Sequence, residues 1–434
     1  MKYSPNKIQY LFYVSILLSI LLISCNKEAS KIDDSNKKPI FPRVVWVENP
    51  MNHAVISWNN LMQSEHGKVH YDTVSRKGSN SKYSIVTDAS RFGKVTIKKM
   101  DFQERVPEAY YYHVELNELK PNTKYYFSLE NDGQFSDEYY FITAPDEIET
   151  IKFVAGGDSR LGGDKPRYAG RTPHIDRQNV MKLIGGLIKT NPDIYAMIHG
   201  ADFGTTADWR HLYWFFDDMK YSIPEDNRLL PYFVSMGNHD TEIGFIENFY
   251  LGENNINEQI AFSYYYSSKV TNDISLITLN TEISLTGVQL EWMQEEFPKK
   301  RSESRWLLVN YHKPAFPAVK DPENYKFKRV RENWVPVIEK NNVDLVIESD
   351  GHSLKRTAPI RSGKVDNKSG ITYIGEGGLG APLREPDTTR WFLKGGFASK
   401  DLHVWLIEVS KDSIDLKAIG IENQVLDNYK IFKK

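Results

Sequence analysis

The sequence predicts two domains of different class, an N-terminal all-β sandwich followed by an α/β domain. A chain of 434 residues exceeds the size of about 250 to 300 residues at which single cores stop growing. Between Phe41 and Ala144, short β-rich runs are separated by turn residues, and no helical period is present. From Ile151, apolar runs alternate with segments of helical spacing. We therefore place the sandwich at residues 40–145 and the α/β domain at residues 150–434.

The composition is that of a protein whose body folds in water, without an excess of positive charge. Hydrophobic residues make up 40% and charged residues 26% of the chain, close to the average for globular proteins. The 55 basic and 57 acidic residues give a formal net charge of -2. Because nucleic-acid binding draws on positive surface charge, no nucleic-acid partner is implied. Nothing in the sequence points to a protein partner.

The N-terminus has the order of a bacterial export signal. Lys2 and Lys7 precede an apolar stretch from Ile8 to Ser24. The stretch ends in Leu22-Ile23-Ser24-Cys25, which resembles the lipobox of bacterial lipoproteins, where cleavage occurs before a cysteine that then carries lipid. An uncleaved anchor helix is the alternative, but the run is at the short end of the ~20 apolar residues that a span needs.

We therefore expect a lipoprotein signal peptide at residues 1–24, lipidation of Cys25 and a flexible tether at residues 25–39. The tether is expected because residues 26–38 are polar and charged. The lipid would anchor the protein in the bacterial cell envelope, at the outer membrane, facing the periplasm or the cell surface. Since Cys25 is the only cysteine, the chain can form no intramolecular disulfide.

The sandwich is predicted from strand-like runs and from one turn motif. Val44 to Val47, Ala54 to Trp58 and Tyr125 to Leu129 read as strands. The segment Leu119 to Tyr125 follows the pattern L-x-P-x-T-x-Y and resembles the corner of fibronectin type III domains. Pro and Asn supply the turn there, and the hydroxyl of Tyr125 can cap the corner.

The α/β domain is predicted from buried-strand runs with helical segments between them. The expected strands are Ile151 to Ala155, Ile194 to Ile198, Pro231 to Ser235, Ile274 to Leu279, Trp306 to Asn310, Val343 to Ile347, Ile371 to Ile374 and Val404 to Ile407. The expected helices are Gln178 to Lys189, Trp209 to Lys220, Val288 to Phe297 and Glu332 to Lys340.

A series of polar motifs follows these strands, each directly after an apolar run. They are Gly157-Asp158-Ser159-Arg160, Gly200-Ala201-Asp202, Gly237-Asn238-His239-Asp240, Tyr311-His312-Lys313-Pro314 and Ser349-Asp350-Gly351-His352. Open α/β sheets place ligands at the carboxyl ends of strands. Carboxylate, amide and imidazole side chains are the ligands of hard and borderline divalent metals. Each motif alone could be a turn or a helix cap, but the whole series favours a metal site.

The order Asp, Asp, Asn-His, His, His resembles the calcineurin-like metallophosphoesterase superfamily. Gly237-Asn238-His239-Asp240 is the most specific match. With the fibronectin-like segment in front, the chain is similar to purple acid phosphatases over Phe41 to Val409. The resemblance implies a four-layer α-β-β-α catalytic domain and a hydrolase that acts on small phosphate esters, most simply phosphomonoesters.

The resemblance also implies roles for individual residues. Asp158 and His352 would bind a first metal, Asp202 would bridge both metals, and Asn238 and His312 would bind the second.

Two divalent or mixed-valence ions of Fe, Zn, Mn or Mg would activate a water whose hydroxide attacks phosphorus. His239 would protonate the leaving group, and Asp240 would orient its ring.

The sequence departs from the family pattern at Thr205 and Arg160. Purple acid phosphatases have a Tyr where Thr205 stands, so the tyrosinate-iron colour is not expected. Arg160 replaces the Gly or His of many relatives, and it either clamps a substrate phosphate or pairs with a nearby carboxylate.

The family's final G-H-x-H motif is also changed. In one register Asp350 takes the place of its first His and His352 that of its second. In the other register His352 is the first His, and Leu354, which cannot bind metal, takes the second place. We prefer Asp350 because a carboxylate keeps the number of ligands, and its charge favours a harder ion such as Mn²⁺ or Mg²⁺ at the second metal.

Two other functions remain open on the sequence. A phosphodiesterase would use the same centre, because only the shape of the pocket separates monoesters from diesters. A surface-binding lipoprotein with a degenerate α/β domain is the second alternative. The oxygen and nitrogen ligands kept at every position other than Thr205 argue against it.

Overall fold

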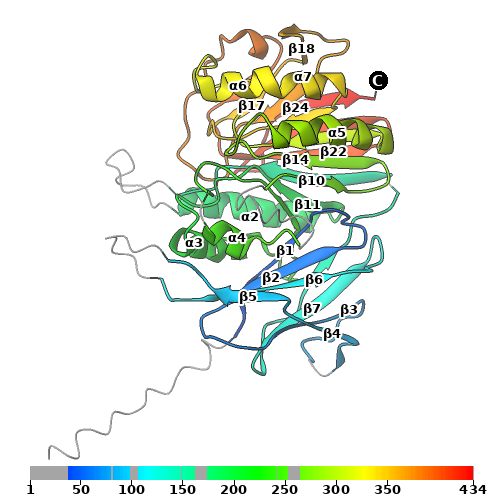
Figure 1. The fold of residues 1–434 in the computed structure, drawn as a ribbon, viewed down its shortest axis with the longest axis vertical. Helices are drawn as coiled ribbons and strands as arrows, with labels where there is room; N and C mark the ends of the chain where they lie inside the picture. Colours follow the sequence, from blue (N-terminus) through cyan, green and yellow to red (C-terminus); the bar gives the residue numbers. More distant parts are fainter. Residues whose placement is uncertain are drawn as a thin grey trace, which may run out of the picture.

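The structure is a computed structural model that describes residues 38–79, 82–97, 106–147, 149–161, 174–241, 243–252 and 264–433 (Figure 1). The predicted signal peptide, Cys25 and nearly all of the predicted tether lie outside these residues. Within them, no helix is both long and apolar enough to cross a membrane.

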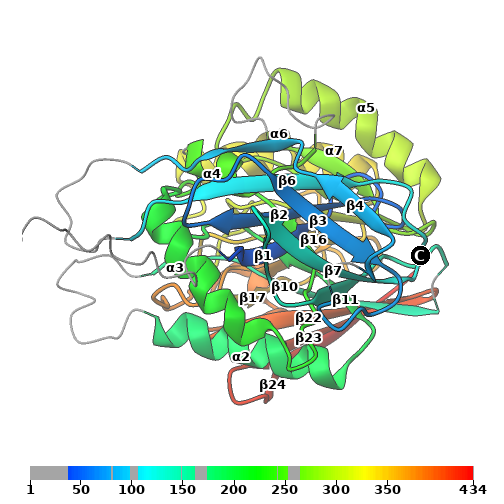
Figure 2. The same ribbon diagram turned by 90° about the horizontal axis from the view of Figure 1, so that it is seen from below.

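The N-terminal part is a β-sandwich, as predicted. One face consists of β1 (Ile40–Val45), β2 (Ala54–Asn60), β6 (Tyr110–Leu116) and β5 (Arg91–Lys94). The other consists of β4 (Ile85–Asp88), β3 (Gly67–Asp72), β7 (Lys124–Asn131) and β8 (Gln134–Phe135), with β9 (Tyr139–Ile142) also on β7. Aromatic side chains fill the space between the faces, where Trp58 stacks on Tyr112 at 5.3 Å between ring centroids. Figure 2 views the sandwich in front of the α/β domain.

The predicted corner of the sandwich is present. The Lys120 amide donates a hydrogen bond of 2.8 Å to the hydroxyl of Tyr125. Asn122 takes a positive φ of 46°, which Asn tolerates better than most residues. The tyrosine hydroxyl therefore satisfies backbone that the turn would otherwise leave unpaired.

The α/β domain has two sheets between two layers of helices. One sheet contains β10 (Thr150–Gly156), β11 (Ile194–His199), β12 (Tyr232–Val234), β22 (His403–Ser410), β23 (Ser413–Gly420) and β24 (Val425–Phe432). The other has the order β13 (Tyr266–Lys269), β14 (Ile274–Thr278), β15 (Trp306–Asn310), β16 (Leu345–Ile347), β20 (Thr372–Gly375), β17 (Leu354–Arg356) and β21 (Phe397–Ser399). A short pair, β18 (Ile360–Arg361) and β19 (Lys364–Val365), stands apart.

The helices lie on the two outer sides of these sheets (Figure 1). One layer contains α2 (Ile175–Thr190), α3 (Trp209–Met219) and α4 (Ile243–Asn248). The other contains α5 (Val288–Glu303), α6 (Tyr325–Asn333) and α7 (Val335–Lys340). Two hydrophobic clusters follow this layering, and the smaller one packs α5, α6 and α7 onto the second sheet through side chains such as Phe297 and Trp334. The layers are therefore of the α-β-β-α type that the resemblance implied.

One sheet runs through both parts of the chain, which the sequence did not predict. Strand β1 of the sandwich pairs in parallel with β12 of the α/β domain, with Val45 beside Tyr232. The Trp46 amide donates to the Tyr232 carbonyl at 2.9 Å, and the Trp46 ring meets that of Phe233 at 5.6 Å. The larger hydrophobic cluster likewise contains residues from both parts. The two parts therefore share a sheet and a core.

Arg43 holds this junction from inside. Its buried guanidinium donates to the side chain of Asn59 in β2 and to the backbone carbonyl of Asn248 at the end of α4, each at 2.8 Å. It also lies 4.2 Å from the ring centroid of Phe216 in α3. Burial lowers the pKa of Arg43 to about 9, so the group stays charged at neutral pH.

The predicted single helix from Glu332 to Lys340 is wrong. Helix α6 ends at Asn333 and α7 begins at Val335, with Trp334 between them. Pro336 lies in the first turn of α7, where its missing N–H costs nothing, whereas inside a longer helix it would break a hydrogen bond. The C-terminal strands β23 and β24 were not predicted either.

Because the sandwich and the α/β domain share a sheet, we predict that the α/β domain does not fold well on its own. We expect residues 150–434 expressed alone to be insoluble or to lack a cooperative thermal transition. The reason is that removal of β1 leaves the edge of β12 unpaired and exposes Phe233. Solubility and circular dichroism melts, compared with residues 38–434, measure this. A soluble fragment that melts cooperatively would show that β1 is dispensable.

Candidate metal centre

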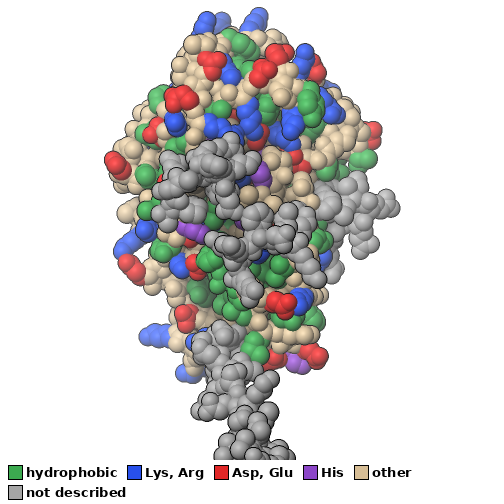
Figure 3. Space-filling model, turned by 90° about the vertical axis from the view of Figure 1, so that its left-hand side faces the viewer, with side chains coloured by type: hydrophobic (Ala, Val, Ile, Leu, Met, Phe, Trp, Pro, Cys, Tyr) green, Lys and Arg blue, Asp and Glu red, His purple; other side chains and the backbone are tan. Residues whose placement is uncertain are grey.

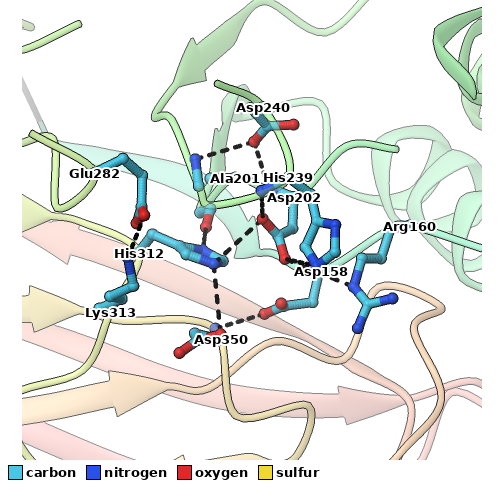
Figure 4. Close-up of polar contacts among 12 residues, drawn as sticks. Asp158, Arg160, Ala201, Asp202, His239, Asp240, Glu282, His312, Lys313 and Asp350 are labelled. Carbon is cyan, nitrogen blue, oxygen red and sulfur yellow. Dashed lines mark hydrogen bonds and ion pairs between the residues drawn. The ribbon is translucent and has the colours of Figure 1, made fainter. Parts of the chain in front are cut away.

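The centre forms where parallel strands of the two sheets end together. Asp158 follows β10 and Asp202 follows β11 in one sheet, whereas His312 follows β15 and Asp350 follows β16 in the other. The carboxyl ends of parallel strands meet at one edge of a sheet, so stacking the two sheets brings the loops together. Figure 4 shows these side chains pointing toward one another.

Glycines allow this close approach. A Cβ atom added to Gly157 would lie 2.3 Å from the Oγ of Ser349, and one added to Gly200 would lie 2.0 Å from the same atom. Ser349 belongs to the loop after β16, so the glycines of the first sheet pack directly against the second. Any side chain in their place would push the sheets apart.

Several of the converging residues have left-handed backbone conformations. The φ angles are 58° for Asp158, 77° for Ala201, 57° for Asp202, 69° for Asp350 and 62° for His352. Such conformations are unfavourable for residues other than glycine and concentrate at functional sites. Cross-loop hydrogen bonds hold them, including Asp158 N–H to the Ala201 carbonyl at 2.9 Å and Asp350 N–H to Asp158 Oδ2 at 2.7 Å.

Asp158, Asp202 and His312 form a buried cluster whose ligand atoms lie within 4.8 Å of one another. His312 Nε2 lies 3.3 Å from Asp202 Oδ1 and 3.7 Å from Asp350 Oδ1. On the other side, His352 Nε2 lies 3.2 Å from Asp158 Oδ1. The structure therefore brings together three carboxylates and two imidazoles.

These residues fit divalent metal ions. Asp158 Oδ1 and His312 Nε2 are buried without a hydrogen-bond partner. The Nδ1 atom of His312 donates to the Gly200 carbonyl at 2.8 Å, and that of His352 donates to the Pro382 carbonyl at 3.0 Å. Each ring therefore keeps an Nδ1 proton on a backbone carbonyl and presents Nε2 to the centre, as metal-binding histidines do.

The electrostatics of the cluster favour a bound cation. Burial raises the pKa values of Asp158 and Asp202, but the facing histidines outweigh burial and bring both below their usual range. Burial lowers the pKa of His312, yet Asp202 and the other carboxylates raise it well above its ordinary value. The buried carboxylates thus stay ionised and need positive charge beside them.

Comparison with known proteins supports the same conclusion. The family described as "Purple acid Phosphatase, N-terminal domain" matches residues 39–143. The family described as "Calcineurin-like phosphoesterase" matches residues 173–355, a range that includes all the candidate ligands except Asp158. The α/β domain is thus similar to the calcineurin-like phosphoesterases, and the sandwich to the N-terminal domain of purple acid phosphatases.

Individual relatives are distant. An uncharacterized protein of Mycobacterium tuberculosis is 24% identical in an alignment of 359 positions that covers 72% of this chain and 61% of that protein. Purple acid phosphatase 21 of Arabidopsis thaliana is 26% identical over 280 residues, 62% of this chain and 58% of that protein. The chain thus spans only about three fifths of the length of these relatives.

Solved structures share the fold. The purple acid phosphatase PPD1 from yellow lupin (Lupinus luteus) seeds superposes with a TM-score of 0.73 at 17% identity, over 91% of this chain and 74% of that one. PhoD gives a TM-score of 0.65 at 12% identity, over 92% and 91%.

Within the centre, Asp240 does not orient His239 as expected. Asp240 is buried, and its Oδ2 accepts the amides of Asp202 at 2.6 Å and Gly237 at 3.0 Å, while Oδ1 accepts the Phe203 amide at 3.1 Å. It therefore fixes the loop that carries Asp202. The Thr205 carbonyl, 2.6 Å from His239 Nδ1, is what orients the His239 ring. A backbone carbonyl has no residue signature, so the sequence could not reveal this partner.

Arg160 pairs with a carboxylate of the centre. Its Nε lies 3.6 Å from Asp202 Oδ2 and has no hydrogen-bond partner, and the side chain is mostly buried. This contact is the pairing with a nearby carboxylate that was one of the two expectations for Arg160. Asn238 is exposed and lines a cavity of 410 Å³ beside the cluster.

The loop after β16 places Asp350 in the cluster and Leu354 outside it. Leu354 belongs to β17 and lies fully buried in the larger hydrophobic cluster. Asp350 also forms an ion pair of 2.5 Å with Lys320, a contact that the sequence analysis missed. A single lysine in a loop has no characteristic spacing that would reveal such a pair.

Gly237 gives a direct test of the centre. An added Cβ would lie 2.3 Å from Asp202 Oδ1 and 2.9 Å from His312 Nε2, so Gly237→Ala should separate these ligands. We expect a loss of metal affinity of about tenfold or more, since misplaced ligands cost that much. Elemental analysis after dialysis against a series of Mn²⁺ concentrations measures the loss.

Gly186→Ala is the matched control, because a Cβ there meets nothing within 4 Å. It should retain the metal content of the wild type. Equal metal affinity in Gly237→Ala and wild type would contradict the proposed arrangement of ligands.

Proposed function

We propose that this chain is a metal-dependent phosphoesterase that hydrolyses phosphate monoesters. The observation that carries the proposal is the buried meeting of Asp158, Asp202 and His312, with ligand atoms that make no hydrogen bond on Asp158 and His312. The match of residues 173–355 to the calcineurin-like phosphoesterase family supports the same reaction class. A phosphodiesterase would use the same residues and is the alternative that the experiment below separates.

The metal ligands we propose are Asp158 and His352 for one ion, Asn238, His312 and Asp350 for the other, and Asp202 between them. Two divalent ions bound there would supply Lewis acidity and a nucleophile at neutral pH. The carboxylate of Asp350 favours a hard ion such as Mn²⁺ or Mg²⁺.

His239 is the residue we propose as proton donor to the leaving group. The bond from Nδ1 to the Thr205 carbonyl fixes the ring, so Nε2 is the atom that can give or take a proton. Nε2 lies 3.9 Å from Asp202 Oδ2, and the side chain is 28% exposed, at the edge of the centre. Arg160 adds positive charge beside Asp202 and stabilises charge that builds on the phosphoryl oxygens.

The test compares two monoesters that differ in their leaving groups, together with a bis-ester. We expect protein loaded with Mn²⁺ to hydrolyse 4-nitrophenyl phosphate and an alkyl phosphate, and bis(4-nitrophenyl) phosphate more slowly. His239→Ala should lower kcat for the alkyl ester by about 100-fold, because a poor leaving group needs a proton. The loss for the nitrophenyl ester should be much smaller, since nitrophenolate leaves unprotonated.

His66→Ala, a change at an exposed position of the sandwich, serves as the control and should leave both rates unchanged. Equal losses on both monoesters would refute the role of His239. Faster hydrolysis of the bis-ester would make the enzyme a phosphodiesterase. No turnover with Mn²⁺, Zn²⁺, Fe or Mg²⁺ would refute the hydrolase and leave a surface-binding lipoprotein.

We further propose that the protein is exported and anchored by lipid at Cys25 in the bacterial cell envelope. The proposal is supported by the apolar stretch that ends in Leu22-Ile23-Ser24-Cys25. In a bacterial host the wild type should fractionate with membranes, and Cys25→Ala should not become acylated, as mass spectrometry of the N-terminal peptide can show. An unmodified Cys25 in the mature wild-type protein would contradict the anchor.

A further inference from the structure

The cavity beside the metal centre has a lysine-rich lining that the proposed reaction does not use. It has a volume of 410 Å³ and is bounded by Asn238, Lys313, Lys320, Asp321, Asn324, Lys326, Phe327 and Asp350. Two of these residues, Asn238 and Asp350, are candidate metal ligands, so the cavity opens on the place where phosphate would bind. A leaving group attached to that phosphate would extend along the lysines.

Two of the three lysines, Lys313 and Lys320, stand on a loop that is held in place, and Lys326 follows in the first turn of α6. Between β15 and α6, the guanidinium of Arg390 donates to the carbonyls of Lys320 at 2.6 Å and Val319 at 3.2 Å, and also to that of Pro317. The guanidinium of Arg331 donates to two further carbonyls of the same loop, those of Ala315 and Pro322. The loop is therefore a fixed wall of the cavity, and the positions of its lysines are built into the fold.

The three lysines of the cavity differ in whether a carboxylate already forms an ion pair with them. Lys313 forms an ion pair with Glu282, and Lys320 forms one of 2.5 Å with Asp350. Lys326, in the first turn of α6, is exposed and has no carboxylate within 4.0 Å among the residues that the structure describes. A divalent ion at Asp350 would compete with Lys320 for the same carboxylate, which would leave a second ammonium group for the cavity.

A guanidinium also lies beside the cavity. Arg384 donates to the Asp350 carbonyl at 3.2 Å. Figure 3 shows several Lys and Arg side chains close together on the upper part of one face of the molecule, above a histidine, with Asp and Glu side chains around them. An anionic substrate is attracted by such a surface, and its attraction is weakened by salt.

We infer that the cavity is a subsite for a second anionic group, so the substrate is a phosphate ester whose leaving group carries a carboxylate or another phosphate. The inference rests on the proposed function for the position of the scissile phosphate. Lys326 is the residue that recognises the second anion, with Lys320 joining it when metal holds Asp350. An ester with an uncharged leaving group makes none of these contacts.

The test uses esters matched in size and reactivity that differ in one charge. We expect kcat/KM of the Mn²⁺-loaded protein to be about tenfold higher for 4-carboxyphenyl phosphate than for 4-carbamoylphenyl phosphate, the effect of one charge-assisted contact. The ratio should fall as salt is added. The bisphosphate of hydroquinone, run beside them, shows whether a phosphate is preferred to a carboxylate.

Variants of α6 assign the preference to the cavity. Lys326→Met should bring the ratio close to one, and Lys326→Arg should retain most of it. Lys328→Met is the matched control, because Lys328 is an exposed residue of the same helix that pairs with Glu323 and Glu332 and does not line the cavity. It should keep the wild-type ratio.

Binding of the two matching phosphonates, measured by calorimetry, separates the inference from the proposed function. Tighter binding of the carboxylated phosphonate, lost in Lys326→Met, without hydrolysis of any ester would uphold the subsite and refute the phosphoesterase. Hydrolysis and binding that are equal for charged and uncharged compounds would uphold the phosphoesterase and overturn the subsite. A preference that survives in Lys326→Met would also overturn it.

Discussion

The contact of Gly157 and Gly200 with Ser349 is the constraint on which the rest of the structure depends. It lets the two sheets approach until the loops after β10 and β11 touch the loop after β16. Only at that separation can His312 from one sheet reach Asp202 from the other, at 3.3 Å. The layered fold thus makes the centre, and the centre in turn restricts which residues the fold can have at the strand ends.

Bringing these loops together costs free energy, and contacts within the centre itself offset part of that cost. Left-handed backbone at Asp158, Asp202 and other residues costs about 1 to 2 kcal/mol for each residue. Buried carboxylates add a desolvation cost. Amide donors directed at Asp240, imidazoles at the carboxylates and the ammonium of Lys320 offset part of it. Divalent ions bound to the carboxylates would offset more of this cost. Their binding would explain why strained backbone and buried carboxylates occur together at the centre.

The sequence was informative about polar residues that directly follow a predicted strand. The residues that follow β10, β11, β15 and β16 could be placed together because parallel strands end at one edge. What it missed depends on contacts between distant parts of the chain: the pairing of β1 with β12, the amides bound by Asp240 and the pair of Lys320 with Asp350. Pro336 could have revealed the break between α6 and α7, because proline is favoured in the first turn of a helix. The prediction of one continuous helix followed the apolar spacing and did not take this proline into account.

The central claim is that Asp202 lies between two metal positions and that Asp350 belongs to one of them. Anomalous diffraction from a crystal of the protein grown with Mn²⁺ tests it most directly. The account predicts two peaks about 3.5 to 4 Å apart on either side of the Asp202 carboxylate, one of them bound by Asp350 and His312. A single peak at Asp158, with Asp350 still paired to Lys320, would contradict it.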